Sequence, residues 1–148
     1  MEKHFDNRDI EYFKQLLRHE DIVIRTRAVC ILAEIGGRRV VDAISDTLTN
    51  DKDSLVRHEA AFALGQLGFT DALIALSHSI NLDPSLFVRH EAAIAVGVIG
   101  SEQGREPLQR ALFDKSQEVR DSAKIALVNL DYISTIKRKG KFARLTGG

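Results

Sequence analysis

The segment Leu55-Val56-Arg57-His58-Glu59-Ala60-Ala61 returns 32 residues later as Phe87-Val88-Arg89-His90-Glu91-Ala92-Ala93. Ile24-Arg25-Thr26-Arg27-Ala28 precedes this pair in the same register, and Val119-Arg120-Asp121-Ser122-Ala123 follows it. A repeat of this length is typical of stacked helical hairpins, in which equivalent residues of neighbouring units lie side by side. We therefore expect the two His-Glu pairs to lie next to each other on one face.

Each repeat opens a run of apolar residues with helical spacing. In the second unit these residues are Val56, Ala60, Ala63, Leu64 and Leu67, and the third unit repeats the pattern. Such a stripe lets an amphipathic helix pack against its neighbours. Glycine directly after the last apolar residue is a common helix stop, which we expect at Gly36, Gly68 and Gly100. The fourth helix is expected to end at Leu130-Asp131.

These patterns predict an all-α fold, an α-solenoid of about four helical hairpins that start near residues 24, 56, 88 and 119. Residues 9–17 indicate one more amphipathic helix, an N-terminal cap, because an end repeat has to cover its neighbour's apolar face. Residues 1–136 are expected to form this single domain. Residues 137–148 are expected to form a flexible basic tail.

Composition places the chain among soluble globular proteins. It has 148 residues, of which 44% are hydrophobic and 28% are charged, as is typical of one domain. Its apolar runs are too short to cross a bilayer, and its start lacks an apolar signal segment. Cys30 is the single cysteine, so no internal disulfide is expected, and its apolar neighbours indicate a small hydrophobic side chain. We expect a cytoplasmic protein with no membrane partner.

The formal net charge is zero, but the charges are distributed unevenly. No acidic residue follows Asp131, while five basic residues lie in the last twelve positions, so residues 1–136 carry a net charge of −5. An acidic body can attract a cationic substrate or metal ions. A short basic tail is usually a solvated end, and a nucleic-acid partner is not expected.

The two His-Glu pairs are the strongest candidate for a functional site. His58 lies about 160–200° around its helix from the apolar stripe, so it points away from the packed layer. Adjacent helices pack about 8–10 Å apart, which lets the rings of His58 and His90 reach one ion. Glu59 and Glu91 add carboxylates beside them, so all four residues are candidate metal ligands. One chain would then offer an open half-site.

A half-site binds metal weakly, because too few donors offset the hydration that the ion loses. A homodimer with a two-fold axis would bring two half-sites together and supply enough ligands for a dinuclear centre. Nitrogen and carboxylate donors with open positions suit non-haem iron, at two ions per dimer, with manganese or zinc as alternatives. The hypothesis is a di-iron homodimer that activates dioxygen.

The wording Val-Arg-x-x-Ala-Ala, followed by Ala-Leu-Gly, resembles HEAT repeats of the phycobilisome-lyase type over roughly residues 20–131. The paired Arg-His-Glu-Ala segments at residues 57–60 and 89–92 resemble one half of deoxyhypusine hydroxylase, a HEAT-repeat di-iron enzyme with two such halves in one chain. The resemblance implies hydroxylation of a cationic, lysine-derived side chain of a protein substrate. It also implies that His58, His90 and Glu91 are iron ligands and that Glu59 is the catalytic carboxylate beside the substrate amine.

A metal-free interpretation stays open. The two positions between arginine and alanine face solvent in any such repeat, so His-Glu there also fits an ordinary polar surface. The alternative function is a HEAT-repeat scaffold that binds a protein partner. His19-Glu20 lies outside the register and is interpreted as a surface or capping pair, and His78 is expected on the other side of the layer. The arginines that recur at the helix starts are expected to bond to neighbouring repeats; they are Arg57, Arg89 and Arg120.

Overall fold

A computed structural model of the chain describes the backbone of residues 1–146 and the side chains of residues 1–140. Its α-helices are α1 (Glu2–Asp6), α2 (Ile10–Leu16), α3 (Ile22–Gly36), α4 (Val41–Asn50), α5 (Ser54–Leu67), α6 (Leu73–Leu82), α7 (Leu86–Ile99), α8 (Arg105–Ala111) and α9 (Gln117–Thr146). Short 3-10 helices precede α4, α6 and α8; they are η1 (Gly37–Val40), η2 (Thr70–Ala72) and η3 (Glu102–Gly104). No strand occurs between residues 1 and 146, which confirms the all-α prediction.

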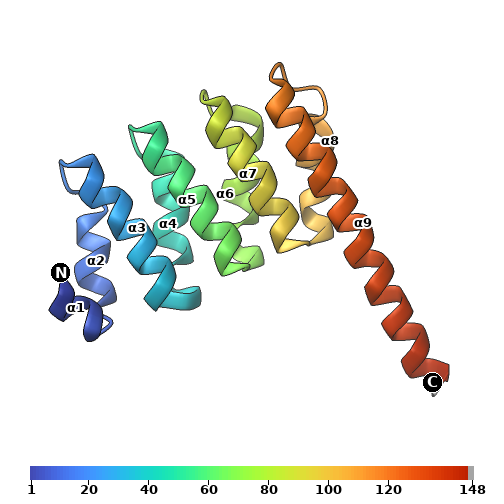
Figure 1. The fold of residues 1–148 in the computed structure, drawn as a ribbon, viewed down its shortest axis with the longest axis horizontal. Coiled ribbons are helices and arrows are strands. Elements are labelled where there is room, and N and C mark those ends of the chain that lie inside the picture. Colours follow the sequence, from blue (N-terminus) through green and yellow to red (C-terminus); the bar gives the residue numbers. More distant parts are fainter. Residues whose placement is uncertain (147–148) are drawn as a thin grey trace.

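The helices form two layers. Helices α3, α5, α7 and α9 pack side by side in the order of the chain, and α4, α6 and α8 pack behind them (Figure 1). We call the first row the front layer and the second row the rear layer. Each hairpin is one front helix and one rear helix, so the predicted solenoid is confirmed.

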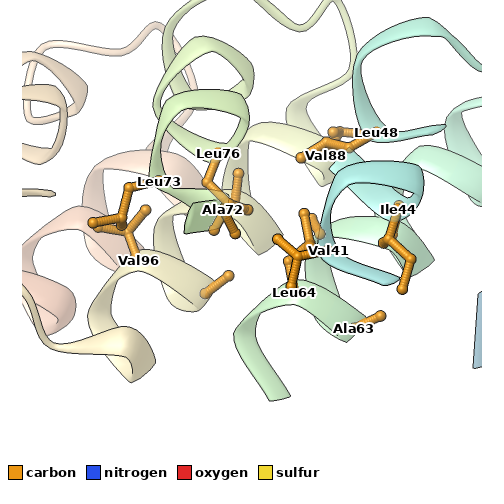
Figure 2. Close-up of a cluster of buried hydrophobic side chains, with 14 of the residues drawn as sticks. Val41, Ile44, Leu48, Ala63, Leu64, Ala72, Leu73, Leu76, Val88 and Val96 are labelled. Carbon is orange, nitrogen blue, oxygen red and sulfur yellow. The ribbon is translucent and has the colours of Figure 1, made fainter. Parts of the chain in front are cut away.

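The core lies between the two layers. Leu64 of α5 is fully buried and lies near Val41 and Ile44 of α4, while Leu76 of α6 belongs to the same cluster (Figure 2). The predicted stripe accounts for the front-layer side of this core, from Val56 and Ala60 to Leu64. Burying one leucine of this kind stabilises the fold by about 1.5–3 kcal/mol, which is why the stripe fixes the face that each helix turns inward.

Two of the three predicted glycine stops are found where expected. Gly68 and Gly100 follow α5 and α7 with φ angles of 77° and 72°, a left-handed conformation that favours glycine. The first stop is one residue later than predicted: Gly36 is the last residue of α3, and Gly37 has the positive φ angle, at 57°. The reason is that η1 begins immediately at Gly37 and turns the chain toward α4.

The recurring arginines join neighbouring hairpins, as predicted. Arg57 donates two hydrogen bonds to the carboxylate of Asp83, at 2.8 and 3.1 Å, and a third to the backbone carbonyl of Asp51. The hydrogen bonds with Asp83 hold the pKa of Arg57 above its ordinary value. The same pairing recurs between Arg25 and Asp51, and between Arg89 and Asp114, whereas Arg120 donates to the backbone carbonyl of Asp114. These buried pairs set the register of each front helix against the next loop.

Glycines bring the front helices into close contact. A Cβ atom added at Gly65 would lie 2.9 Å from the Cβ and 3.0 Å from the Cα of Ala95 on α7. Gly97 meets Ala126 of α9 in the same way. The backbones of α5, α7 and α9 therefore lie close together, which brings the side chains on their outer surfaces within reach of one another.

The N-terminal cap is present. Helix α2 follows the N-cap Asp9, whose side chain accepts a hydrogen bond from the backbone N–H of Tyr12, and it buries Phe13 against the first hairpin. Helix α1 is an addition that the sequence did not predict. It stacks the ring of His4 on that of Tyr12, with the centroids 3.8 Å apart.

The end of the chain differs from the prediction. Helix α9 does not stop at Leu130-Asp131 but continues to Thr146 and projects beyond the other helices (Figure 1). No glycine stop interrupts it, and Arg105 ties its middle to η3 by binding both Glu102 and Asp131, each at 2.8 Å. The expected boundary at residue 136 is therefore not a break in the helix, and residues 147–148 of the predicted tail lie outside the described residues. Within residues 1–146, no helix combines the length and the hydropathy that a membrane span requires.

Candidate metal centre

The repeat register places four polar pairs side by side on the outer surface of the front layer. We call them the polar row; they are residues 26–27 on α3, 58–59 on α5, 90–91 on α7 and 121–122 on α9. The side chain of His58 is 35% exposed, so it points away from the core as predicted. Glu91 is more buried, with 12% of its side chain exposed, because it lies in the contact between α5 and α7.

The histidine of the first His-Glu pair contacts the glutamate of the second pair, on the adjacent front helix. The Nε2 atom of His58 lies 3.4 Å from Oε2 of Glu91. This juxtaposition follows from the close packing of α5 on α7, because the residues are 33 positions apart in sequence but on facing sides of adjacent helices. An imidazole nitrogen and a carboxylate oxygen at this separation can share a proton or a cation.

His90 contacts the next helix instead. Its Nδ1 atom lies 2.5 Å from the hydroxyl oxygen of Ser122 on α9. The same hydroxyl donates its one proton to the backbone carbonyl of Glu118, at 2.8 Å. Because the hydroxyl proton is given to that carbonyl, we assign the ring of His90 as the donor to Ser122, a tautomer with its proton on Nδ1 and a lone pair on Nε2.

Glu59 contacts the preceding helix. The thiol of Cys30 on α3 donates a hydrogen bond to Oε1 of Glu59, at 3.2 Å. Partial shielding of the thiol from water, together with this carboxylate, raises the pKa of Cys30 to about 11, so the thiol stays protonated near neutral pH. Cys30 is exposed, so its interpretation as one more hydrophobic residue of the apolar run was wrong. Ala28, Val29 and Leu32 fill the core, while Cys30 faces outward beside the polar row.

The four predicted site residues thus share one surface but do not all meet in one chain. His58 and Glu91 come together, whereas Glu59 and His90 turn toward Cys30 and Ser122. Among residues 1–140, no three histidine, cysteine, aspartate or glutamate side chains are grouped closely enough to hold a metal ion. Within one chain, the arrangement is therefore a pair of potential ligands with two others beside it.

The remaining histidine candidates lie elsewhere. His19 lies just before α3, where its ring accepts a hydrogen bond from the backbone N–H of the N-cap residue Asp21 and its carbonyl accepts one from Arg25. It lies outside the polar row, as the sequence analysis expected for a surface or capping pair. His78 is exposed on α6 of the rear layer, on the other side from the polar row, also as predicted.

Sequence reasoning missed Ser122 and Cys30 as neighbours of the site, although the repeat contains a signal for both. Ser122 stands in the fourth unit where Glu59 and Glu91 stand in the second and third. Cys30 is equivalent to Phe62, one helical turn beyond Glu59. Aligning all four units therefore predicts which residues of the first and fourth front helices lie beside the His-Glu pairs, namely Cys30 and Ser122.

Comparison with protein families agrees with this architecture. The sequence family of HEAT repeats matches residues 10–97, and the family of the PBS lyase HEAT-like repeat matches residues 88–114. The chain belongs to the HEAT-repeat family. No curated protein matches it by sequence.

Among solved structures, that of human deoxyhypusine hydroxylase in complex with glycerol is similar to this chain. The TM-score is 0.78 and the sequence identity is 30%. The match covers 84% of this chain and 44% of the human one, so this chain spans less than half of the length of that protein. The resemblance seen in the repeated His-Glu segments thus extends to the three-dimensional fold.

Proposed function

We propose that this HEAT-repeat chain is the subunit of a non-haem di-iron hydroxylase, in which two copies complete one dinuclear centre. The observation that carries the proposal is the approach of His58 to Glu91 across adjacent repeats, at 3.4 Å. The structural similarity to human deoxyhypusine hydroxylase supports the proposed hydroxylase activity, because that protein is by name a hydroxylase.

The residues present fit an iron ion. Two ligand atoms that each lie about 2.1 Å from one ion, at about 90–110° to each other, are about 3.0–3.4 Å apart. The separation of His58 Nε2 and Glu91 Oε2 lies at the upper end of that range. Imidazole with carboxylate is also the donor set that non-haem iron prefers, with manganese and zinc as alternatives.

The other two residues of the pairs have separate roles in this proposal. Ser122 fixes the proton of His90 on Nδ1, so its Nε2 is a free donor on the same surface. Glu59 is half-buried at the edge of the site and serves as the carboxylate that binds a cationic, lysine-derived side chain. The net charge of −5 over residues 1–136 attracts such a substrate.

A second copy is part of the proposal, since one chain offers too few ligands. Two half-sites that face each other provide four imidazoles and the two carboxylates of Glu91, enough for two ions, with both copies of Glu59 beside them. An iron pair held in this way supplies the activation of dioxygen. The residues of the chain bind the metal and orient the substrate amine.

Metal analysis of protein from iron-supplemented expression tests the proposal. The unmodified chain is expected to hold about one iron per chain and to gain a near-ultraviolet or visible absorption band in air. His58→Ala and Glu91→Ala are expected to lose both. His78→Ala and Glu34→Ala are matched controls, because His78 lies on the rear layer and Glu34 is exposed on α3, and both should retain iron.

Two results would contradict the proposal. One is an unmodified chain that carries no transition metal after expression with iron. The other is iron content that stays the same when His58 or Glu91 is replaced, since the metal would then be bound elsewhere.

A metal-free scaffold is the second candidate function. It is favoured by the finding that no three potential ligands are grouped within residues 1–140 of one chain. On this hypothesis the front surface binds a protein segment, and the His58→Ala variant keeps that binding. Iron content separates the two functions directly.

A further inference from the structure

Exposed apolar residues border the polar row on both sides. One row, toward the helix starts, contains Val23, Leu55 and Phe87 at equivalent positions of α3, α5 and α7. A second row, one turn beyond the polar row, contains Phe62, Ile94 and Ile125 on α5, α7 and α9, and Val98 continues it on α7. These seven side chains are between 37% and 71% exposed. We call them the two apolar rows.

The exposed apolar surface is as large as the largest apolar patch of a typical monomer, and such patches are often functional. A large apolar side chain presents about 150 Å² when fully exposed, so seven that are about half exposed present on the order of 500 Å². Typical monomers have a largest patch of about 300–600 Å², and a stable interface buries about 800 Å² on each partner. The two apolar rows with the polar row between them therefore have the extent of a protein interface.

The charges at the two ends of the polar row are opposite. Arg27 on α3 is exposed and has no hydrogen bond or ion pair within residues 1–140. Asp121 on α9 is 53% exposed, and its ion pair within residues 1–140 is a long one with Lys124, at 4.0 Å. The surface is thus positive at its first helix and negative at its last, with the His-Glu pairs between them.

This polarity selects how a second copy can lie on the surface. A two-fold axis perpendicular to the helices, in the plane of the interface, puts each helix over its own copy and sets Arg27 against Arg27. Such like-charge contacts are unfavourable. An axis parallel to the helices puts α3 over the partner's α9 and α5 over the partner's α7, which sets opposite charges against each other.

We propose that the two apolar rows bind a second copy of this chain face to face, about a two-fold axis parallel to the helices, so that Arg27 pairs with the partner's Asp121. The two rows supply the buried apolar area, and the two symmetric ion pairs fix the orientation. The arrangement sets His58 and Glu59 opposite the partner's His90 and Glu91. The inference rests on the proposed function in one respect, which is that a second copy is required. The contacts named here contain no metal.

Sedimentation equilibrium of the full chain in chelator tests this surface without iron. The unmodified chain is expected to be a dimer. Arg27→Asp and Asp121→Arg are each expected to weaken dimerisation at least tenfold, since each reversal acts at both ion pairs. The double variant restores the opposite charges and is expected to return within about threefold of the unmodified dissociation constant. Asp42→Arg, a reversal on the rear layer, is the control and should have no effect.

A second pair of variants tests the apolar rows. Phe87→Ser is expected to weaken the dimer at least tenfold, whereas Ile74→Ser should not, although Ile74 is 86% exposed on α6 of the rear layer. Circular dichroism checks that each variant is folded; both positions are exposed, so neither change disturbs the core.

The outcomes separate this inference from the proposed function. A chain that is monomeric in chelator overturns the inference, even where iron makes it dimerise, and so does a double variant that remains as weak as either single variant. Binding of a different protein to this surface in place of self-association also overturns it. A chelator-resistant dimer with the expected variant pattern supports the inference, even where metal analysis finds no iron and the proposed function fails.

Discussion

Replacing Arg57 by methionine tests whether the arginine pairs hold the hairpins together. Arg57 and Asp83 are buried, with 11% and 6% of their side chains exposed. The change removes three hydrogen bonds and leaves the carboxylate of Asp83 without its cation. Methionine keeps the apolar length of the side chain, so lost packing contributes little.

The expected cost is large because the remaining charge is buried. Removing one partner of a buried ion pair destabilises a protein by about 3–5 kcal/mol. Asp83 keeps a hydrogen bond from the backbone N–H of Ser85, at 2.9 Å, so we expect the lower end, about 3 kcal/mol. Replacing both partners, as Arg57→Met with Asp83→Leu, should recover most of this loss, because a well-packed apolar pair is often as stable as a buried ion pair.

Urea unfolding followed by circular dichroism measures the free energy of unfolding of each variant. Arg38→Met is the matched control, because Arg38 also pairs with an aspartate, Asp71 at 2.8 Å, but is 67% exposed. Water screens that pair, so the control should change stability far less. An Arg57→Met variant no less stable than Arg38→Met, or a double variant less stable than the single one, would contradict this account of the buried pair.

Three further predictions concern packing, pH and the site. Gly65→Ala should destabilise the chain by about 1–3 kcal/mol, because the new methyl group clashes with the backbone of α7. Gly140→Ala in α9 should stabilise it by about 0.5–1 kcal/mol, because alanine favours a helix more than glycine does. Urea unfolding measures both, and equal effects would contradict the close packing of α5 on α7. Burial raises the pKa of Asp114, but hydrogen bonds from a guanidinium on α7 and a backbone N–H outweigh it and hold the pKa below the ordinary 3.8. A carboxyl whose pKa is lowered by folding stabilises the fold above its ordinary pKa, so the free energy of unfolding should fall as the pH drops below about 3.8. The fall should be less steep in Asp114→Asn, and the same dependence on pH in both proteins would argue against this. In metal-free protein at alkaline pH, nitrogen NMR should find the proton of His90 on Nδ1, and Ser122→Ala should shift it partly to Nε2; an unchanged spectrum would remove the assigned role of Ser122.

Much of the fold could be predicted because the same sequence features recur at the same position of successive repeats. Arg57 was expected to bond to a neighbouring repeat, and it binds Asp83 and the carbonyl of Asp51. Gly68 and Gly100 end their helices as expected. The end of α9 was not predictable in this way, because the fourth unit has Asp131 at the position where Gly68 and Gly100 end the second and third front helices.

The candidate site was predictable in place but not in its contacts. The register shows that His58 and Glu91 share a surface, yet it does not show which of the four side chains meet. His58 and His90 each contact the same register position on the next front helix, which is Glu91 for His58 and Ser122 for His90, whereas Glu59 contacts Cys30 on the preceding helix. The outward direction of Cys30 was missed because a run of apolar residues conceals which of its members face the core.

The amino-acid sequence by itself determined the period, the stripe of each helix, the arginine pairs and the surface that carries the His-Glu segments. These features depend on local spacing, which repeats along the chain. The packing of the helices decided that His58 meets Glu91, that His90 meets Ser122, and that the apolar residues on both sides of them are exposed. The physical reason is that contacts between side chains depend on how closely and at what offset whole helices pack, and glycines such as Gly65 bring those helices together.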